Sequence, residues 1–160
     1  MKDKKECLNF LNSLPKKRMG AGVLFFYERK LLIVKPSYKD HWLTPGGIVE
    51  KDESPRETCE REAKEEIGLS VKIEELICVD YIGEKDGASE NIQFVFLGGN
   101  LSSEQVKNIK IDGKEIVEYG FFNYEDALEM LSEKSGKRIK NFLDNYDRKS
   151  VLYLENGDVV

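Results

Sequence analysis

The sequence contains few cysteines and prolines, and each shortage excludes a class of protein. Its three cysteines, Cys7, Cys59 and Cys78, are scattered and form no Cys-x-x-Cys pair. A disulfide framework or a zinc site is therefore not expected, and reduced thiols in a cytoplasm are the simpler interpretation. All four prolines lie within the first 55 residues, and no stretch rich in glycine, serine or proline divides the 160-residue chain. We expect a single domain over residues 1–160.

Long hydrophobic runs and an excess of positive charge are also missing. No apolar run approaches the roughly 18 residues of a membrane-spanning helix, so no membrane partner is expected. The formal net charge of −5 differs from the basic footprint of nucleic-acid-binding proteins, so no nucleic-acid partner is expected either. An anionic small molecule remains compatible with this charge if a bound metal ion supplies local positive charge.

Strand-like and helix-like segments alternate along the chain, which predicts a layered α/β domain. Residues 2–14 are expected to form a short amphipathic helix within an N-terminal extension, residues 1–16. Hydrophobic runs predict a hairpin and three further strands, at 20–27, 31–35, 71–82, 91–98 and 115–122. A helical pattern follows over residues 125–146, and Gly136 is expected to break it.

Negative charge is concentrated in residues 46–69, where seven of 24 residues are glutamate. We expect a loop followed by a helix that begins at Pro55, with Ser54 as its N-cap and Glu57 completing a capping box. Gly68 is placed to end this helix in the left-handed conformation. The helical repeat predicts a narrow apolar stripe of Cys59, Ala63 and Ile67.

Three carboxylates, those of Glu62, Glu65 and Glu66, fall side by side on the neighbouring face of this helix. A solvated charged face, neutralised by lysines and arginines of the same helix, is one interpretation. The other is a site for a hard cation such as Mg²⁺, which takes oxygen ligands and would relieve the repulsion among the glutamates. The glycines Gly46 and Gly47 favour the metal site, because they allow a tight turn whose carbonyls can face a ligand.

The same segment resembles the Nudix box. The residues that occupy the positions of the box in register are Gly47, Glu53, Arg61, Glu62, Glu65, Glu66, Gly68 and Leu69. Ala63 stands where the family usually has a larger aliphatic residue, which affects packing and not chemistry. With the flanking strands and the closing helix, the resemblance extends over roughly residues 17–148.

The resemblance implies a Nudix-like α/β/α sandwich with a mixed β-sheet, in which residues 46–69 are the catalytic loop and helix. It also implies hydrolysis of a nucleoside diphosphate linked to another moiety, with Mg²⁺ or Mn²⁺ as cofactor. The implied metal ligands are Glu62, Glu65, Glu66 and a backbone carbonyl at Gly46 or Gly47.

Catalytic roles are implied for three residues of the box. Glu62 is expected to take a proton, Arg61 to orient a glutamate by a salt bridge, and Glu53 to act as an outer ligand or to stabilise a water molecule on the metal. Because the general base varies within the family, Glu115 and Glu118 are further candidates. Exposed charges at a strand edge are the alternative interpretation of those two residues.

Substrate contacts are expected from Lys35 and Lys39 for phosphate and from Trp42 for a base. Solvated lysines and a core tryptophan are the alternatives. No proline follows Pro55, and the region where diadenosine polyphosphate hydrolases carry a tyrosine is residues 84–87, Glu-Lys-Asp-Gly. A compact nucleotide is therefore expected as substrate, with ADP-ribose and diadenosine polyphosphates poor.

A second hypothesis is a Nudix-like module that binds a nucleotide and regulates without hydrolysing it. The loss of a carboxylate from the box would favour such a module, and here all of them are present. A homodimer is compatible with either hypothesis.

Overall fold

The computed structural model describes residues 3–73, 75–85, 87–145 and 150–160. Its strands are β1 (Arg18–Tyr27), β2 (Lys30–Pro36), β3 (Gly46–Ile48), β4 (Glu75–Ile82), β5 (Asn91–Asn100), β6 (Ile116–Phe122), β7 (Leu152–Glu155) and β8 (Asp158–Val159). Its helices are α1 (Lys4–Ser13), α2 (Pro55–Ile67), α3 (Ser103–Lys107), α4 (Tyr124–Met130) and α5 (Glu133–Asn145).

The strands form one mixed sheet with the order β6-β2-β1-β5-β4-β7-β8, and β3 pairs with β1 beside this path. The central strand β1 runs parallel to β5 along one edge. Its other edge is shared, because β2 pairs antiparallel with Phe26 and Tyr27 while β3 pairs antiparallel with residues 20–22. The strand β2 therefore diverges from β1 beyond the pair Phe26–Leu31, and β3 occupies the same edge of β1 at residues 20–22.

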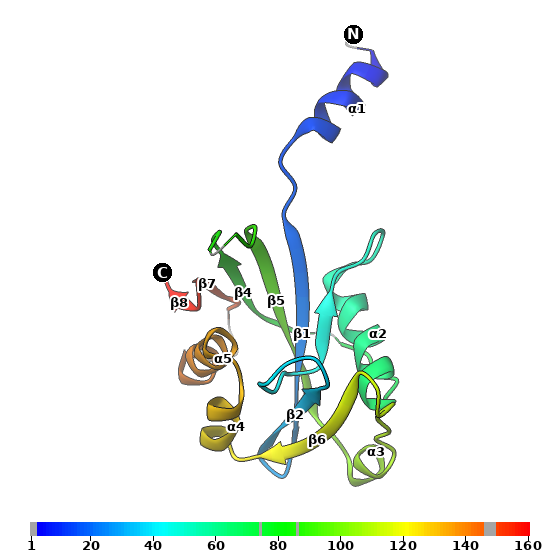
Figure 1. Ribbon diagram of the computed structural model, residues 1–160, viewed down its shortest axis with the longest axis vertical. Helices are drawn as coiled ribbons and strands as arrows, with labels where there is room; N and C mark the ends of the chain where they lie inside the picture. Colours follow the sequence, from blue (N-terminus) through cyan, green and yellow to red (C-terminus); the bar gives the residue numbers. More distant parts are fainter. Residues whose placement is uncertain (1–2, 74, 86, 146–149) are drawn as a thin grey trace.

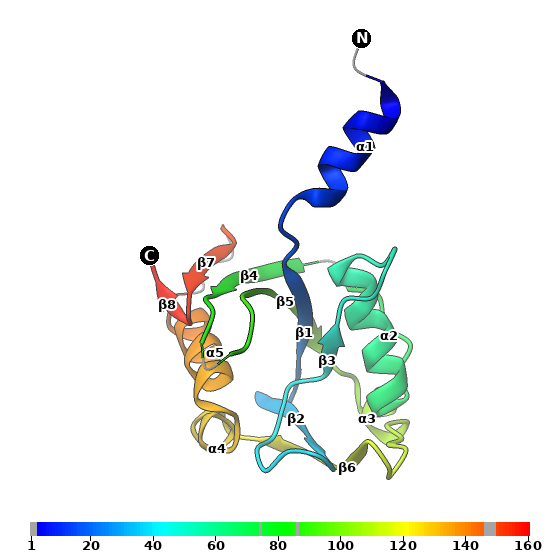
Figure 2. The same cartoon turned by 45° about the horizontal axis from the view of Figure 1, so that its top comes forward.

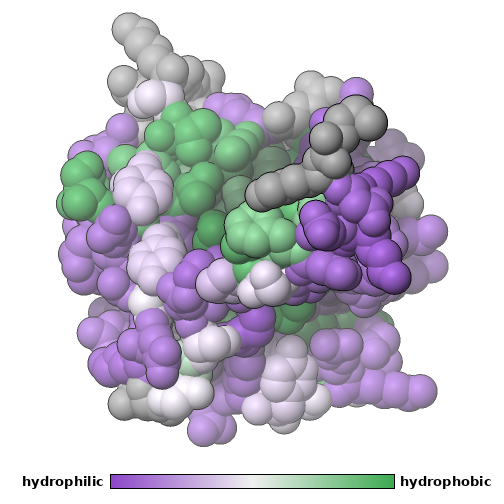
Figure 3. All heavy atoms as spheres, turned by 90° about the horizontal axis from the view of Figure 1, so that it is seen from above, coloured by the Kyte–Doolittle hydropathy of each residue, from purple (hydrophilic) through white to green (hydrophobic). Residues whose placement is uncertain are grey.

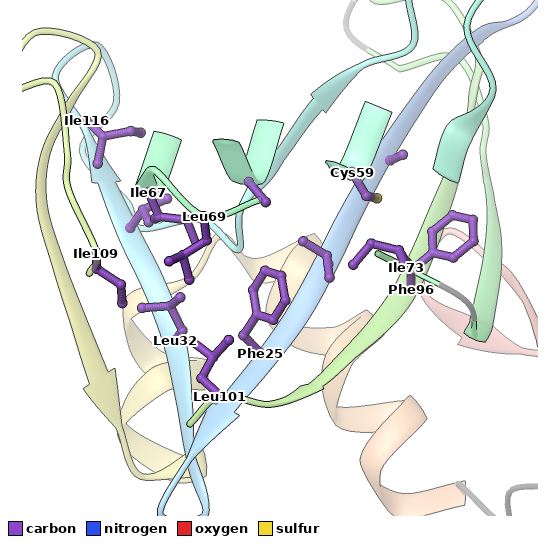
Figure 4. Packing of buried hydrophobic residues seen from close by; sticks show 14 residues of the cluster. Phe25, Leu32, Cys59, Ile67, Leu69, Ile73, Phe96, Leu101, Ile109 and Ile116 are labelled. Atoms are coloured by element: carbon purple, nitrogen blue, oxygen red, sulfur yellow. The ribbon is translucent and has the colours of Figure 1, made fainter. Parts of the chain in front are cut away.

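Helices cover both faces of the sheet, with α2 on one side of β1 and α4 and α5 on the other (Figures 1 and 2). One hydrophobic cluster joins α2 to the sheet, and a second joins α4 and α5 to its opposite face. Figure 4 shows the first cluster, in which Cys59 and Ile67 of α2 lie over Phe25 of β1. The predicted α/β/α sandwich with a mixed sheet is confirmed.

The helix α2 has the ends that its sequence predicts. The Ser54 side chain accepts a hydrogen bond from the Glu57 amide and the Glu57 side chain accepts one from the Ser54 amide, which completes the capping box. Gly68 ends the helix at φ 73°, in the left-handed region that glycine adopts without strain. The apolar stripe of Cys59, Ala63 and Ile67 is fully buried.

The predicted break at Gly136 is wrong. Gly136 lies buried inside α5, and the chain leaves the helical conformation earlier, at Leu131, between α4 and α5. The Ser132 hydroxyl accepts a hydrogen bond from the Ser135 amide and so starts the new helix. Glycine at position 136 serves packing, because a Cβ there would lie 3.1 Å from the Leu128 carbonyl oxygen.

Other boundaries also differ from the sequence prediction. The strand expected from residue 71 begins at Glu75, and β3, α3, β7 and β8 were not predicted. The expected helix ends at residues 2 and 146, and the end of the resemblance at residue 148, lie outside the described residues.

The predicted N-terminal helix is present as α1, which stands apart from the sheet and buries none of its residues (Figure 1). Hydrophobic side chains are exposed on the end of the molecule from which α1 leaves (Figure 3). Those of α1 and the residue after it are Leu8, Phe10, Leu11 and Leu14, and those of the C-terminal segment are Val151, Tyr153, Val159 and Val160. In the part of the chain that the structure describes, no helix is both long enough and apolar enough to cross a membrane.

A buried ion pair ties α5 to the sheet. Asp80 of β4 is fully buried, and it accepts hydrogen bonds from Arg138 Nε at 2.7 Å and from the Gly157 amide at 3.0 Å. Asp80→Ala is expected to lower the free energy of unfolding by about 3 kcal/mol, because it leaves the Arg138 charge without its partner. Chemical denaturation measures this loss. Asp158→Ala, which removes an exposed ion pair with Lys137, is the control and should cost much less.

Candidate active site

Arg61 is the centre of the charged network on α2. Its Nε donates to Glu53 at 2.8 Å, and its Nη1 donates to Glu62 at 2.8 Å and to Glu65 at 3.0 Å. Its Nη2 also reaches the Ile48 carbonyl of β3 at 3.3 Å. One guanidinium thus positions three carboxylates and joins the helix to the strand before it, because its planar fork presents donors in several directions.

Glu53 anchors this network from the loop that enters the helix. It accepts hydrogen bonds from Arg61, from the Thr58 hydroxyl at 2.7 Å and from the Glu50 amide at 3.1 Å. These bonds, that of Arg61 foremost, lower the pKa of Glu53 to about 2. Glu53 is therefore an ionised anchor for Arg61 at neutral pH.

Glu66 and Glu62 lie deeper than the other carboxylates of the box. Glu66 is 6% exposed, and its Oε2 accepts a hydrogen bond from the Gly46 amide at 2.9 Å. Burial raises the pKa of Glu66 to about 8, and burial also raises that of Glu62 in spite of its bond to Arg61. Both carboxylates are thus held where ionisation is unfavourable unless positive charge is added.

The backbone of β3 approaches these carboxylates closely because residues 46 and 47 are glycine. At Gly46, φ is 148°, and a Cβ there would overlap the Ala21 carbonyl oxygen of β1. At Gly47, a Cβ would overlap the Glu62 carboxylate itself. The pair Gly46-Gly47 therefore lets the backbone of β3 lie directly against the Glu62 carboxylate and against β1.

A cavity of about 440 Å³ opens beside Gly47 and Glu62. Strands β1 and β5 contribute the stretches 20–22 and 93–95, and the segment after β2 contributes Tyr38, Lys39, His41, Leu43 and Thr44. Its other lining residues are Gly46, Ile48, Glu115, Ser132, Ser135, Arg138 and Ile139. The cavity thus begins at Glu62 of α2 and ends at α5, where β1 and β2 have separated.

Two residues outside the box, Glu115 and Tyr38, line the end of the cavity next to Glu62. Glu115 lines the cavity, and its charge contributes to the raised pKa of Glu62 and of Glu66. Tyr38 lines the same wall, and its pKa is raised by partial burial and then by the charges of Glu115, Glu66 and Glu62. Glu118, the other base candidate, is the register partner of Lys35 in the antiparallel pairing of β2 with β6. It is not among the described residues that line the cavity.

The donor set of the box fits a hard divalent cation in its chemistry. Glu62, which is half-buried, and Glu66, which is buried, supply carboxylate oxygens, and glycine backbone lies against them. In the described part of the chain, however, no three His, Cys, Asp or Glu side chains stand together as a ready-made metal site. Arg61 holds Glu62 and Glu65, and the Gly46 amide holds Glu66. The assignment of Glu62, Glu65, Glu66 and Gly47 as metal ligands stays a prediction.

Of the three predicted substrate contacts, Lys35, Lys39 and Trp42, one lines the cavity and two lie elsewhere. Lys39 lines the cavity. Lys35 instead donates to the Lys39 carbonyl at 3.0 Å, so that it shapes the loop. Trp42 packs edge-on against Phe122 at a centroid separation of 5.3 Å, in the hydrophobic cluster under α4 and α5. Neither Lys35 nor Trp42 is among the described residues that line the cavity.

The residues at the far end of the cavity could not be recognised from the sequence. Gln93 of β5 and the α5 residues Ser135 and Arg138 belong to no recognised motif. Gln93 follows the alternation of a strand, and Arg138 reads as one charge among many on an amphipathic helix. Asp80, an aspartate inside a hydrophobic strand, indirectly indicates the role of Arg138, because a buried carboxylate requires a cationic partner.

Comparisons with known proteins show which family and which solved structures the chain is similar to. A family model described as the NUDIX domain matches residues 16–146. Diphosphoinositol polyphosphate phosphohydrolase 3-alpha of Mus musculus is 30% identical over 118 residues, which are 72% of this chain and 69% of the relative.

Solved structures share the fold. The MutT protein of Methanosarcina mazei Go1 is 25% identical with a TM-score of 0.65, over 86% of this chain and 98% of that chain. A UDP-X diphosphatase is 24% identical with a TM-score of 0.69, over 95% of this chain and 75% of that chain.

Proposed function

Because the chain belongs to the NUDIX domain family, a family of pyrophosphohydrolases, we propose that it hydrolyses a nucleoside diphosphate linked to another moiety, with Mg²⁺ or Mn²⁺ as cofactor. The observation that carries the proposal is the half-buried carboxylate of Glu62, which lines the cavity, beside the buried carboxylate of Glu66, which the Gly46 amide of β3 holds. As a member of this family, the protein is a hydrolase of phosphoric anhydride bonds.

Glu62, Glu65 and Glu66 would hold the ion, with the backbone carbonyl of Gly47. A divalent ion supplies positive charge for the diphosphate and lowers the pKa of water. The position of Glu62 in the cavity lining supports it as the group that would take the proton of the attacking water, and Glu115 is the second candidate in the same lining. Arg61 and Glu53 position Glu62 and Glu65.

The lining of the cavity favours a nucleotide over a highly phosphorylated ligand. Among its described lining residues, the cations are Lys39 and Arg138, whereas Glu62 and Glu115 are anions. A polyphosphate with charges all around it would need more lysines and arginines than these. We infer that Lys39 contacts phosphate and that a compact nucleoside di- or triphosphate, or a nucleotide-linked small group, occupies the cavity.

Metal-dependent hydrolysis is the expected result when the purified protein is tested against a panel of nucleotides. The panel includes the common nucleoside triphosphates, ADP-ribose and a diadenosine polyphosphate, and phosphate release is followed with a coupled phosphatase. Activity should require Mg²⁺ or Mn²⁺, and ADP-ribose and the dinucleotide should be at least tenfold poorer in kcat/KM. Millimolar metal should also raise the melting temperature, because it binds only the folded carboxylate cluster.

Glu118→Gln is the matched control for this assay, because it removes a carboxylate that does not line the cavity. A protein that binds nucleotides but releases no product from any of them would support the regulatory module instead. A melting temperature that stays constant up to millimolar metal would favour a solvated acidic helix.

A further inference from the structure

The far end of the cavity offers hydrogen-bond donors with little net charge. Arg138 lines it together with Ser135, and its side chain is only 12% exposed. Its Nε donates to the buried carboxylate of Asp80 at 2.7 Å. The guanidinium is therefore fixed in place, and its charge is already balanced inside the protein.

The remaining donors of Arg138 are available to a ligand. Of the contacts that the described residues make with this side chain, the hydrogen bond and ion pair with Asp80 go through Nε, and none goes through Nη1 or Nη2. A planar pair of N–H groups matches a planar pair of acceptors. The cavity is lined by Glu62 of α2 at one end and by Ser135 and Arg138 of α5 at the other. The helices α2 and α5 lie on opposite sides of β1 (Figure 2).

Apolar side chains line part of the same cavity. Leu43, Phe94, Val95 and Ile139 line the cavity with apolar surface. A nucleotide whose diphosphate lies at Glu62 would place its base along these walls, with one edge towards Arg138. A neutral acceptor edge fits this end better than a second phosphate does, because Asp80 already neutralises the guanidinium.

We propose that Arg138 determines specificity by donating to the O6 and N7 acceptors of a 6-oxopurine base, so that the preferred substrate is a guanine or hypoxanthine nucleotide. This inference rests on the proposed function. Adenine offers an N6 amino donor where guanine offers the O6 acceptor, so it places a donor against the donors of Arg138. A site built for one hydrogen-bonding pattern rejects the opposite pattern strongly, because buried polar groups are then left unpaired.

The test compares kcat/KM for GTP, ITP, 7-deaza-GTP and ATP at saturating Mg²⁺. GTP and ITP should be similar, since both carry O6 and N7, and ATP should be about tenfold or more poorer. The analogue 7-deaza-GTP, which lacks the N7 acceptor, should fall between GTP and ATP. In Arg138→Lys, which keeps a cation beside Asp80 but loses the planar fork, the ratio of GTP to ATP should fall to within about threefold of one.

Two further variants separate recognition from folding. Lys137→Met removes the neighbouring cation of α5, which does not line this cavity, and should keep the GTP-to-ATP ratio of the unaltered protein. The double variant Asp80→Asn with Arg138→Met removes the buried charge pair as a unit, and should lose the preference while it stays folded in a thermal melt.

Equal kcat/KM for GTP and ATP in the unaltered protein would overturn this inference and leave the hydrolase assignment intact. A preference that survives both Arg138→Lys and the double variant would do the same. If no nucleotide is hydrolysed at any metal concentration, the proposed function and the inference fall together.

Discussion

Glu66→Gln is expected to lower kcat/KM by about 100-fold or more, and at the same time to make the metal-free protein more stable at pH 8. Glutamine has nearly the same shape, and its amide oxygen can still accept the hydrogen bond from the Gly46 amide. It cannot ionise, and it is a poor ligand for a hard cation. The variant therefore separates a functional carboxylate from a structural one.

The gain in stability follows from the direction of the pKa shift. The pKa of Glu66 is about 8 in the folded protein, because of burial, against about 4.5 in the unfolded chain. Between these two values the folded state binds more protons than the unfolded state, so that the free energy of unfolding falls as the pH rises from about 4.5 to 8. Glu66→Gln should remove this loss, which is on the order of 1–3 kcal/mol at pH 8.

Urea denaturation of the metal-free protein and the variant at pH 5 and pH 8 measures this difference. The control is Glu65→Gln, because the Glu65 side chain lies on the same helix and is 59% exposed. Near-normal turnover by Glu66→Gln at limiting Mg²⁺ would remove Glu66 from the site. A variant that loses stability equally at both pH values would show that its carboxylate serves only the fold.

Arg61→Lys is expected to lower kcat/KM by about 10- to 100-fold, although the charge is kept. A lysine ammonium can contact one or two of the groups that Arg61 now joins, which are three carboxylates and the Ile48 carbonyl. Glu62 and Glu65 would lose their fixed orientation. Glu53, which lies in the loop before α2, would lose its hydrogen bonds from the guanidinium of Arg61.

The matched control is Arg56→Lys, an exposed arginine in the first turn of the same helix, which should keep both activity and melting temperature. The split between kcat and KM is informative, since Arg61 acts by positioning other groups. We expect kcat to carry most of the loss. If Arg61→Lys turns over substrate like the unaltered protein, the network serves the solubility of the helix and not its chemistry.

The part of the site that could be predicted from the sequence is the part coded within one helix. The capping box at Ser54, the left-handed Gly68 and the buried stripe of α2 depend on neighbours fewer than 15 positions apart. Local physical rules therefore predicted the ends of α2 and the faces on which its carboxylates lie.

The donor end of the cavity could not be predicted in the same way. Asp80 and Arg138 are 58 positions apart, and only the packing of α5 on the sheet brings them together. The Gly136 prediction failed for a related reason, because a glycine that suits helix packing looks in the sequence like a glycine that ends a helix. The positions of Lys35 and Trp42 likewise depend on tertiary neighbours, the loop at Lys39 and the ring of Phe122.

The parallel pairing of β1 with β5 has a consequence for the order of folding. Arg18 pairs with Asn91, 73 positions later in the chain, so this contact requires the closure of a large loop. The hairpin of β1 with β2 and the helix α2 need only local contacts, and such contacts form faster than distant ones. In a refolding experiment, α2 should therefore gain its helical signal before the cavity between residues 20–22 and 93–95 exists, and nucleotide binding should be recovered last.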